Sequence, residues 1–167
     1  MTVRAAREGD VELVAALIDD ATAWVGELGF RQWPLPFPRE EIAAAIARGE
    51  VFLAEVDGDA VATVTVLEAD PFFWGTREPD ALYVHKLAVR RDQAGRGIGA
   101  ALVDWVDCVA VGSGREYLRL DCLRDDAGIR RYYERLGFEY RGDLDDVPRG
   151  LVVSLYERPV RSGRRVS

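Results

Sequence analysis

Three glycines at alternate positions, Gly95, Gly97 and Gly99, mark the segment whose composition is most informative about chemistry. Glycine lets backbone N–H groups approach a phosphate closely, and the N-terminus of a following helix adds free donors and a positive dipole end. Nearby arginines add positive charge: Arg90, Arg91 and Arg96. The segment therefore predicts an anion site suited to a pyrophosphate, in preference to a turn that merely redirects the chain.

Two classes of cofactor use such a loop. The same glycines fit the dinucleotide-binding pattern GxGxxA, which would end at Ala100, and Asp121 lies at about the right later distance to bind a ribose. In a dinucleotide-binding unit the first glycine follows its strand almost directly, whereas residues 90–94 separate the predicted strand from Gly95. An acyl-CoA therefore fits this spacing better than a nicotinamide dinucleotide.

A lone histidine, His85, precedes the glycine loop and is the side chain best suited to proton transfer. Histidine has an ordinary pKa near neutrality, so it can accept a proton from a nucleophile under physiological conditions. Glu68 and Glu55, on neighbouring predicted strands, are alternative bases. A histidine packed at a sheet surface with a satisfied hydrogen bond is the competing structural interpretation.

The two cysteines, Cys108 and Cys122, form no CxxC motif and no Cys/His cluster. They indicate reduced thiols rather than a disulfide framework, and no metal site is expected. Cys122 could in principle carry an acyl group as a nucleophile. A buried, inert thiol is the more usual role of such a residue.

Composition predicts one domain over residues 1–158 of the 167-residue chain, followed by a basic and flexible tail at 159–167. No apolar run is long enough to cross a membrane, and no signal core opens the chain, so we expect a cytoplasmic protein. The net charge of -7 argues against nucleic acid and anionic membranes as partners. The negative charge mildly favours cationic partners. A homodimer is possible.

Hydrophobic periodicity predicts the elements that must position these residues. Helices are expected at 11–28, 39–48, 97–111 and 126–136, and strands near 3–4 and at 51–56, 60–67, 81–89, 117–122, 138–141 and 151–157. Asp10 is a plausible N-cap of the first helix, Gly29 should end that helix, and Asp57-Gly58 should close a hairpin. The aromatic-rich segment 70–80 is predicted to be a loop.

This order of elements predicts an α/β fold with a mixed, twisted sheet of about seven strands and helices on both faces. Early hairpins imply antiparallel pairing. The unit of strand, helix and strand between residues 81 and 122 implies one right-handed parallel crossover.

Two segments resemble the motifs of the GNAT superfamily of N-acetyltransferases. Residues 84–89, Val-His-Lys-Leu-Ala-Val, together with the Gly-Arg-Gly-Ile-Gly run at 95–99, are similar to its acetyl-CoA-binding motif. Residues 130–138, Arg-Arg-Tyr-Tyr-Glu-Arg-Leu-Gly-Phe, resemble its second motif, a helix ending in Tyr-Glu-x-x-Gly-Phe. The two lie about 35 residues apart in the expected order, which makes the resemblance specific.

The resemblance implies acetyl-CoA as acyl donor and a set of residues that hold it. The pantetheine should pair with backbone near Leu87 and Val89, and the N–H of Leu87 or Ala88 should stabilise the thioester oxygen. The pyrophosphate should lie on the amides of five residues: Gly95, Arg96, Gly97, Ile98 and Gly99. Asp126 stands where relatives often have Asn beside CoA, and Asp92 stands where they often have Gln or Arg.

Catalytic roles also follow from the resemblance. His85 lies where family members often place a glutamate base, so we expect it to deprotonate an attacking amine. Tyr133 matches the family tyrosine that protonates the departing sulfur. Tyr132 should face elsewhere, because adjacent helical residues diverge by about 100°.

The acceptor site implied by the resemblance involves the first two helices, their proline-rich link and the loop before residue 81. Candidate acceptor-binding residues are Trp24, Trp33, Glu68 and Trp74, with Phe72 and Phe73 beside them. Aromatic rings near carboxylates suit an organic cation, so a small cationic primary amine is the expected acceptor. Two alternatives remain at this point. The acceptor is a protein amine, or the chain is a non-catalytic acyl-CoA sensor with the same fold.

Overall fold

The structure is a computed structural model that describes residues 1–161. The chain divides into two compact units, Met1–Val66 with Lys86–Val103, and Leu67–His85 with the described part of Asp104–Ser167. Of the predicted basic tail, residues 162–167 lie outside the described residues. No helix within residues 1–161 is both long and apolar enough to cross a membrane.

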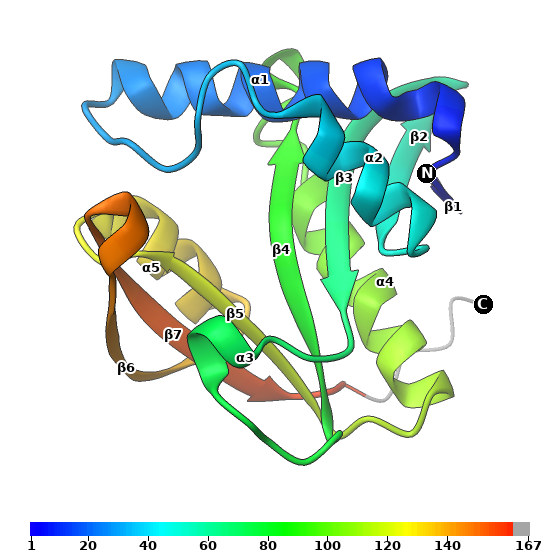
Figure 1. The fold of residues 1–167 in the computed structure, drawn as a ribbon. Coiled ribbons are helices and arrows are strands. Elements are labelled where there is room, and N and C mark those ends of the chain that lie inside the picture. Colours follow the sequence, from blue (N-terminus) through cyan, green and yellow to red (C-terminus); the bar gives the residue numbers. More distant parts are fainter. Residues whose placement is uncertain (162–167) are drawn as a thin grey trace. The chain divides into compact units, whose positions relative to one another are not determined.

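Residues 1–161 form seven strands and five α-helices. Their arrangement is drawn in Figure 1. The strands are β1 (Thr2–Ala5), β2 (Val51–Val56), β3 (Asp59–Leu67), β4 (Ala81–Val89), β5 (Tyr117–Leu123), β6 (Glu139–Asp146) and β7 (Leu151–Pro159). The helices are α1 (Val11–Glu27), α2 (Arg39–Ala47), α3 (Pro71–Trp74), α4 (Ile98–Gly112) and α5 (Ala127–Arg135). The strands follow the order β1-β2-β3-β4-β5-β7-β6, which confirms the predicted mixed α/β sheet.

The first unit is built on antiparallel pairing of β1 with β2 and of β2 with β3. The β2–β3 hairpin turns at Asp57 and Gly58, which both have positive φ, as the favoured two-residue hairpin turn requires. Apolar residues of α1, α2 and β2 share one buried core cluster that includes Leu17, Ile42 and Leu53.

Helix α1 begins and ends close to where it was predicted, but its expected side-chain cap is missing. Gly29 adopts a φ of 88° and donates its N–H to the carbonyl of Gly26, so it terminates the helix. Asp10 occupies the N-cap position without a side-chain cap bond. Its carboxylate instead binds the Arg4 guanidinium at 2.7 Å and accepts the Arg7 N–H at 2.7 Å, which corrects the expected capping role.

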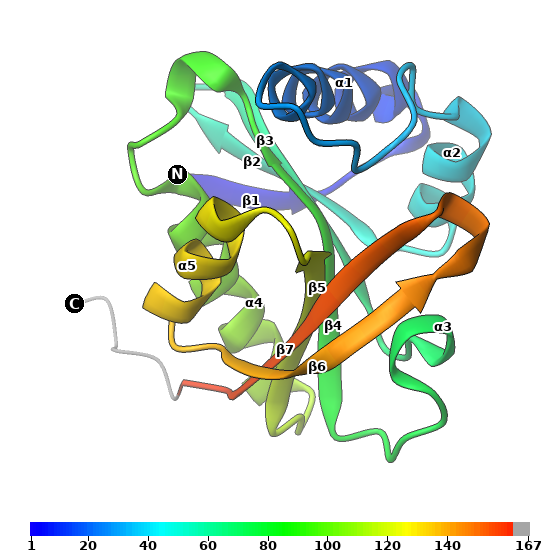
Figure 2. The same cartoon turned by 90° about the vertical axis from the view of Figure 1, so that its left-hand side faces the viewer.

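The second unit contains the single parallel pair (Figure 2). β4 pairs in parallel with β5 from Ala81↔Tyr117 to Val84↔Leu120, as the predicted crossover requires. β5 pairs antiparallel with β7, and β7 with β6, so that β6 and β7 form a long hairpin next to β5. β6 extends to Asp146, well beyond its predicted end at 141.

The two faces of the second unit's strands carry different helices. On one face, Trp74 of α3 packs with Tyr83 of β4 and Leu155 of β7. On the other face, Tyr156 of β7 bonds through its hydroxyl to Glu134 of α5. Helices therefore cover both faces here, as expected. The short helix α3 corrects the prediction of an unstructured 70–80 loop, and its first turn follows from Asp70-Pro71, a capping residue before a proline.

Candidate active site

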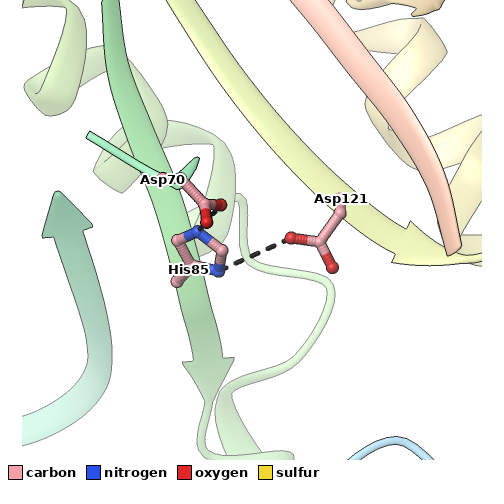
Figure 3. Close-up of side chains that lie close together, drawn as sticks. All are labelled: Asp70, His85 and Asp121. Atoms are coloured by element: carbon pink, nitrogen blue, oxygen red, sulfur yellow. Dashed lines mark hydrogen bonds and ion pairs between the residues drawn. The ribbon is translucent and has the colours of Figure 1, made fainter. Parts of the chain in front are cut away.

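His85 lies between two carboxylates of the second unit (Figure 3). Its Nε2 is 2.8 Å from Oδ2 of Asp70, and its Nδ1 is 3.5 Å from Oδ1 of Asp121. The side chains are 15%, 7% and 13% exposed for His85, Asp70 and Asp121, so all three are largely buried yet reachable from solvent. Each ring nitrogen thus faces its own acceptor.

Asp70 holds the nearer position because the local backbone fixes its carboxylate. It is the N-cap of α3, and its Oδ1 accepts the N–H of Phe73 at 3.4 Å. Its Oδ2 lies 2.8 Å from His85 Nε2, an ordinary hydrogen-bond length, and accepts a hydrogen bond when that nitrogen carries the hydrogen. A carboxylate held in this way selects the imidazole tautomer that has its hydrogen on Nε2.

Asp121 reaches the other ring nitrogen because of strand register. Val84 of β4 is level with Leu120 of β5, so the next residues, His85 and Asp121, come level and share a face. The separation of 3.5 Å is within ion-pair distance but longer than a strong hydrogen bond. The Asp121 considered above as a ribose ligand therefore belongs to the histidine cluster.

An aromatic side chain and an arginine extend this cluster. The ring of Phe73 is 6.1 Å from the imidazole, tilted by 33°. The Arg149 guanidinium, from the turn between β6 and β7, lies 5.6 Å from the Phe73 ring and also pairs with the buried Asp146. The surroundings of His85 therefore combine carboxylates, one aromatic face and one cation.

Tyr133 and Cys122 lie on the opposite face of these strands. Cys122 follows Asp121 on β5, so its side chain points away from His85. Tyr133 is 8% exposed and packs edge-on against Phe138 at 5.8 Å. Burial raises the pKa of Tyr133 far above its ordinary value, and the Cys122 thiol adds to this effect. The phenol is therefore kept protonated and can only donate.

A hydrogen-bond chain fixes the helix that carries Tyr133. The fully buried Tyr156 hydroxyl donates to Glu134 at 2.9 Å and accepts from Arg130 Nε at 3.0 Å. At the helix start, Asp126 Oδ1 accepts the N–H groups of Gly128 and Ile129. Asp126 is thus the predicted N-cap. Tyr132 is half-buried, with its ring 5.3 Å from that of Tyr133, and faces a different direction.

The glycine loop belongs to the first unit, and its backbone is shaped as an anion cradle requires. Gly95 and Gly97 both adopt φ of 77°, a conformation that disfavours any side chain. A Cβ added at either position would meet nothing within 4 Å, so no other part of the chain packs on that side of these glycines. α4 begins at Ile98 with no acidic residue in its first turn, so the N–H groups of Ile98 and Gly99 keep the positive potential of a helix start.

Helix α1 holds the start of this loop in place. The Arg91 N–H donates to Asp20 at 2.8 Å, and its guanidinium lies 4.1 Å from the Trp24 ring. Trp24, expected in the acceptor site, is thus engaged with the glycine loop. Asp92 binds Arg90 at 2.7 Å, which lowers the pKa of Asp92 and offsets its negative charge.

The strand before the loop bears the residues expected to hold the pantetheine. Lys86 has a φ of 48°, which interrupts the regular alternation of β4 immediately after His85. Ala88 is 2% exposed, whereas Leu87 and Val89 are partly exposed. The N–H of Arg90 bonds to the Val61 carbonyl at 2.8 Å and closes the strand against β3.

The other predicted site residues are exposed, ion-paired or packed within cores. Glu68 is 82% exposed, with Arg115 at 3.7 Å as its nearest ionic partner. Trp74 is 6% exposed and packs against Tyr83 at 6.2 Å. Trp33 packs against the core under α1 and α2, and Glu55 pairs with Arg4 at 2.7 Å. Sequence reasoning missed Asp70, whose signal was the Asp-Pro pair that starts α3.

Comparison with known proteins identifies the family. A family model described as the acetyltransferase (GNAT) family matches residues 12–138, which is more than half of the chain. The Bacillus subtilis protein YesJ, described as an uncharacterized N-acetyltransferase, is 30% identical over 141 residues, covering 80% of this chain and 78% of YesJ. The chain belongs to the GNAT family and is an acetyl-CoA-dependent N-acetyltransferase.

Solved structures share the fold at lower sequence identity. A GNAT-family acetyltransferase from Listeria monocytogenes superposes with a TM-score of 0.78 at 24% identity, covering 95% of this chain and 94% of that chain. N-acetylglutamate synthase from Neisseria gonorrhoeae, complexed with coenzyme A and N-acetyl-glutamate, gives a TM-score of 0.71 at 21% identity. That match covers 96% of this chain and 35% of the synthase.

Proposed function

We propose that this enzyme acetylates the primary amine of a small cationic molecule by direct attack in a ternary complex. The observation that carries the proposal is the position of His85 between Asp70 and Asp121. An imidazole flanked by two carboxylates favours a ligand that arrives with a positive charge and gives up a proton. An ammonium group that becomes an amide fits this requirement.

His85 acts as the base. An ammonium has no lone pair, so it must lose a proton before it can attack a carbonyl. The hydrogen bond from Nε2 to Asp70 leaves the Nδ1 lone pair as the acceptor of that proton. The amine then forms the C–N bond as the C–S bond of the donor breaks.

Tyr133 supplies the proton that the departing sulfur needs. Its raised pKa keeps the phenol protonated throughout the physiological range, so its O–H can donate to the sulfur as negative charge develops there. The second amine proton, released as the amide forms, and the proton on His85 leave to solvent, and solvent returns one proton to the phenol. One free thiol and one amide result from each ammonium and thioester.

Direct attack is preferred over an acyl-cysteine route through Cys122. Burial, with Asp121 adding to it, raises the pKa of the Cys122 thiol to about 12. Only about one part in 10⁵ of such a thiol is ionised at pH 7, and the thiolate is the reactive form. No step in the proposed reaction requires a metal. The free thiols Cys108 and Cys122 suit the reducing cytoplasm, which is the proposed compartment.

The first unit fits the acyl donor. Acetyl-CoA supplies the activated acetyl group, and the amides at Gly95, Gly97 and the start of α4 suit its pyrophosphate. Leu87, Ala88 and Val89 would pair with the pantetheine, Arg96 would add charge, and Asp126 would hold the start of α5. The Neisseria synthase, complexed with coenzyme A, supports this assignment by its shared fold.

Two alternative functions lead to different results in one assay. The enzyme is incubated with acetyl-CoA and a panel of amines that includes diamines, amino-acid derivatives and peptides with free N-termini, and release of CoA thiol is measured. Turnover with small cationic amines supports the proposal. Turnover only with peptides would point to a protein acceptor, and tight acetyl-CoA binding without any turnover would point to a sensor.

A further inference from the structure

The two carboxylates that face His85 differ in distance, anchoring and burial. Asp70 is the closer and the more buried, and its second oxygen is tied to the backbone of α3. Asp121 is farther from the ring, at 3.5 Å, and is nearly twice as exposed. A carboxylate that is fixed and close suits a permanent partner of the ring, whereas one that is farther from the ring suits a transient partner.

The geometry points to a division of labour within this cluster, which rests on the proposed function. We propose that Asp70 is a positioning residue that holds the hydrogen of His85 on Nε2, and that Asp121 binds the ammonium of the acceptor. Charge-assisted N–H···O bonds are about 2.7–2.9 Å long. An ammonium nitrogen at that distance from both Asp121 Oδ1 and His85 Nδ1 spans the 3.5 Å between them.

Proton movement through the cluster then balances. One N–H of the ammonium stays hydrogen-bonded to Asp121, and another proton passes to His85 Nδ1. The amine then attacks with the electron pair that this proton leaves behind. The resulting imidazolium has an N–H toward each carboxylate, Nε2 toward Asp70 and Nδ1 toward Asp121. The cluster therefore stabilises the charge that it has taken from the substrate.

The same three residues do not converge as ligands of one ion in the arrangement described. One oxygen or nitrogen of each lies within 4.8 Å of the others, a spacing compatible with a metal cluster. The carboxylates, however, face different nitrogens of the ring, Nε2 and Nδ1. A proton relay uses both nitrogens, whereas an ion would bind only one of them.

The chain offers a direct test, because His85 is its only histidine. Protein labelled with ¹⁵N-histidine gives ring-nitrogen signals from His85 alone, and their shifts report which nitrogen carries hydrogen in the neutral ring. The wild-type, chelator-treated protein should show hydrogen on Nε2. Asp70→Asn should shift the population toward Nδ1–H, and Asp121→Asn should leave Nε2–H in place.

Kinetics with one good amine separate the two carboxylates. Asp121→Asn should raise the KM for the amine about 10-fold or more, with the KM for acetyl-CoA unchanged, because a charge-assisted bond is lost. Asp70→Asn should lower kcat about 10- to 100-fold, and Asp70→Glu should restore part of it. Asp125→Asn, which removes an exposed carboxylate paired with Arg124, is the matched control for charge and should change neither constant.

The outcomes distinguish this inference from the proposed function. Hydrogen on Nδ1 in the wild type, or an unchanged amine KM in Asp121→Asn, would overturn the division of labour even if the enzyme acetylates amines. Activity lost to the chelator and restored by Zn²⁺ would replace the relay with a metal site. If no amine is acetylated, the proposed function fails, and the Nε2–H signal still decides the role of Asp70.

Discussion

The glycine loop of the first unit is formed by backbone groups, whereas the histidine cluster of the second unit is formed by side chains. The loop relies on backbone: positive φ at Gly95 and Gly97, no other part of the chain packed where their Cβ would be, and the start of α4. The cluster relies on side chains from three separate segments, which contribute Asp70, His85 and Asp121. Binding of the donor should therefore respond to changes in conformation, and catalysis to changes in functional groups.

His85→Gln should give the largest effect, and it should fall on catalysis alone. Glutamine keeps a polar side chain but cannot take up a proton, so kcat should fall by about 10²–10⁴. Acetyl-CoA affinity should stay within about twofold, because the loop is built from backbone. Steady-state kinetics and calorimetric titration of the same preparation check both halves. A loss of acetyl-CoA affinity as large as the loss of kcat would contradict the assignment of donor binding to the loop and of catalysis to the cluster.

Tyr133→Phe should also act on kcat, by about 10- to 100-fold, because only the hydroxyl is removed from a side chain that stays buried. Tyr132→Phe is the matched control, since it removes a neighbouring hydroxyl on the same helix. The donor role predicts that acyl donors with better leaving groups are less affected by Tyr133→Phe. An equal loss with all donors would assign Tyr133 to packing.

Gly97→Val should weaken CoA binding about tenfold or more, because a branched side chain resists φ of 77° and hinders the close approach of a phosphate to the amides. Gly58→Val is the matched control. It imposes similar strain at φ of 87° in the β2–β3 turn of the same unit. Calorimetric titration should show reduced CoA affinity only for Gly97→Val, and equal losses in both variants would reduce the effect to general destabilisation.

Cys122→Ala should change kcat by no more than about twofold if no acyl-cysteine forms. The pKa of about 12 further predicts that Cys122 resists alkylation near neutral pH, while the exposed Cys108 reacts. Because burial raises this pKa, the alkylation rate of Cys122 should still be rising with pH in the range where that of an ordinary thiol has levelled off. Mass spectrometry after timed alkylation, with Cys108→Ser as the background, measures this.

Glu68→Gln should have the smallest effect of all. Glu68 is 82% exposed and interacts with Arg115 at 3.7 Å, and exposed pairs of this kind contribute about 0–1 kcal/mol. Both kcat and the KM for the amine should stay within about twofold. A large loss of rate would restore Glu68 as a base and displace the cluster around His85.

The two regions also differ in how far the sequence predicts them. The loop is local: three glycines between a strand and a helix already imply its conformation, and the structure has the predicted helix start. The order of the elements was predicted for the same reason, because periodicity within each element is local. The N-cap at Asp126 and the hairpin at Asp57-Gly58 likewise depend on adjacent residues.

The histidine cluster depends on residues that are far apart in the sequence, and only His85 was predicted as part of it. His85 was identified by its chemistry, and Glu68 and Glu55 were named as alternative bases, but Asp70 was not considered. Whether a carboxylate near a strand end turns inward depends on the helix that follows. Asp70 turns inward as the cap of α3, which the sequence analysis treated as loop. Asp121 reaches His85 through the register of β4 and β5, which a single sequence does not specify.

The central claim, that His85 is the base of a direct acetyl transfer, is tested most directly by the pH dependence of kcat/KM. Wild type and His85→Gln are compared with one good amine across the acidic range. An acidic limb due to the base should be present in wild type and absent from His85→Gln, while any limb due to protonation of the amine itself should persist in both. If His85→Gln retains the full rate and the full acidic limb, the base is another residue and the account is wrong.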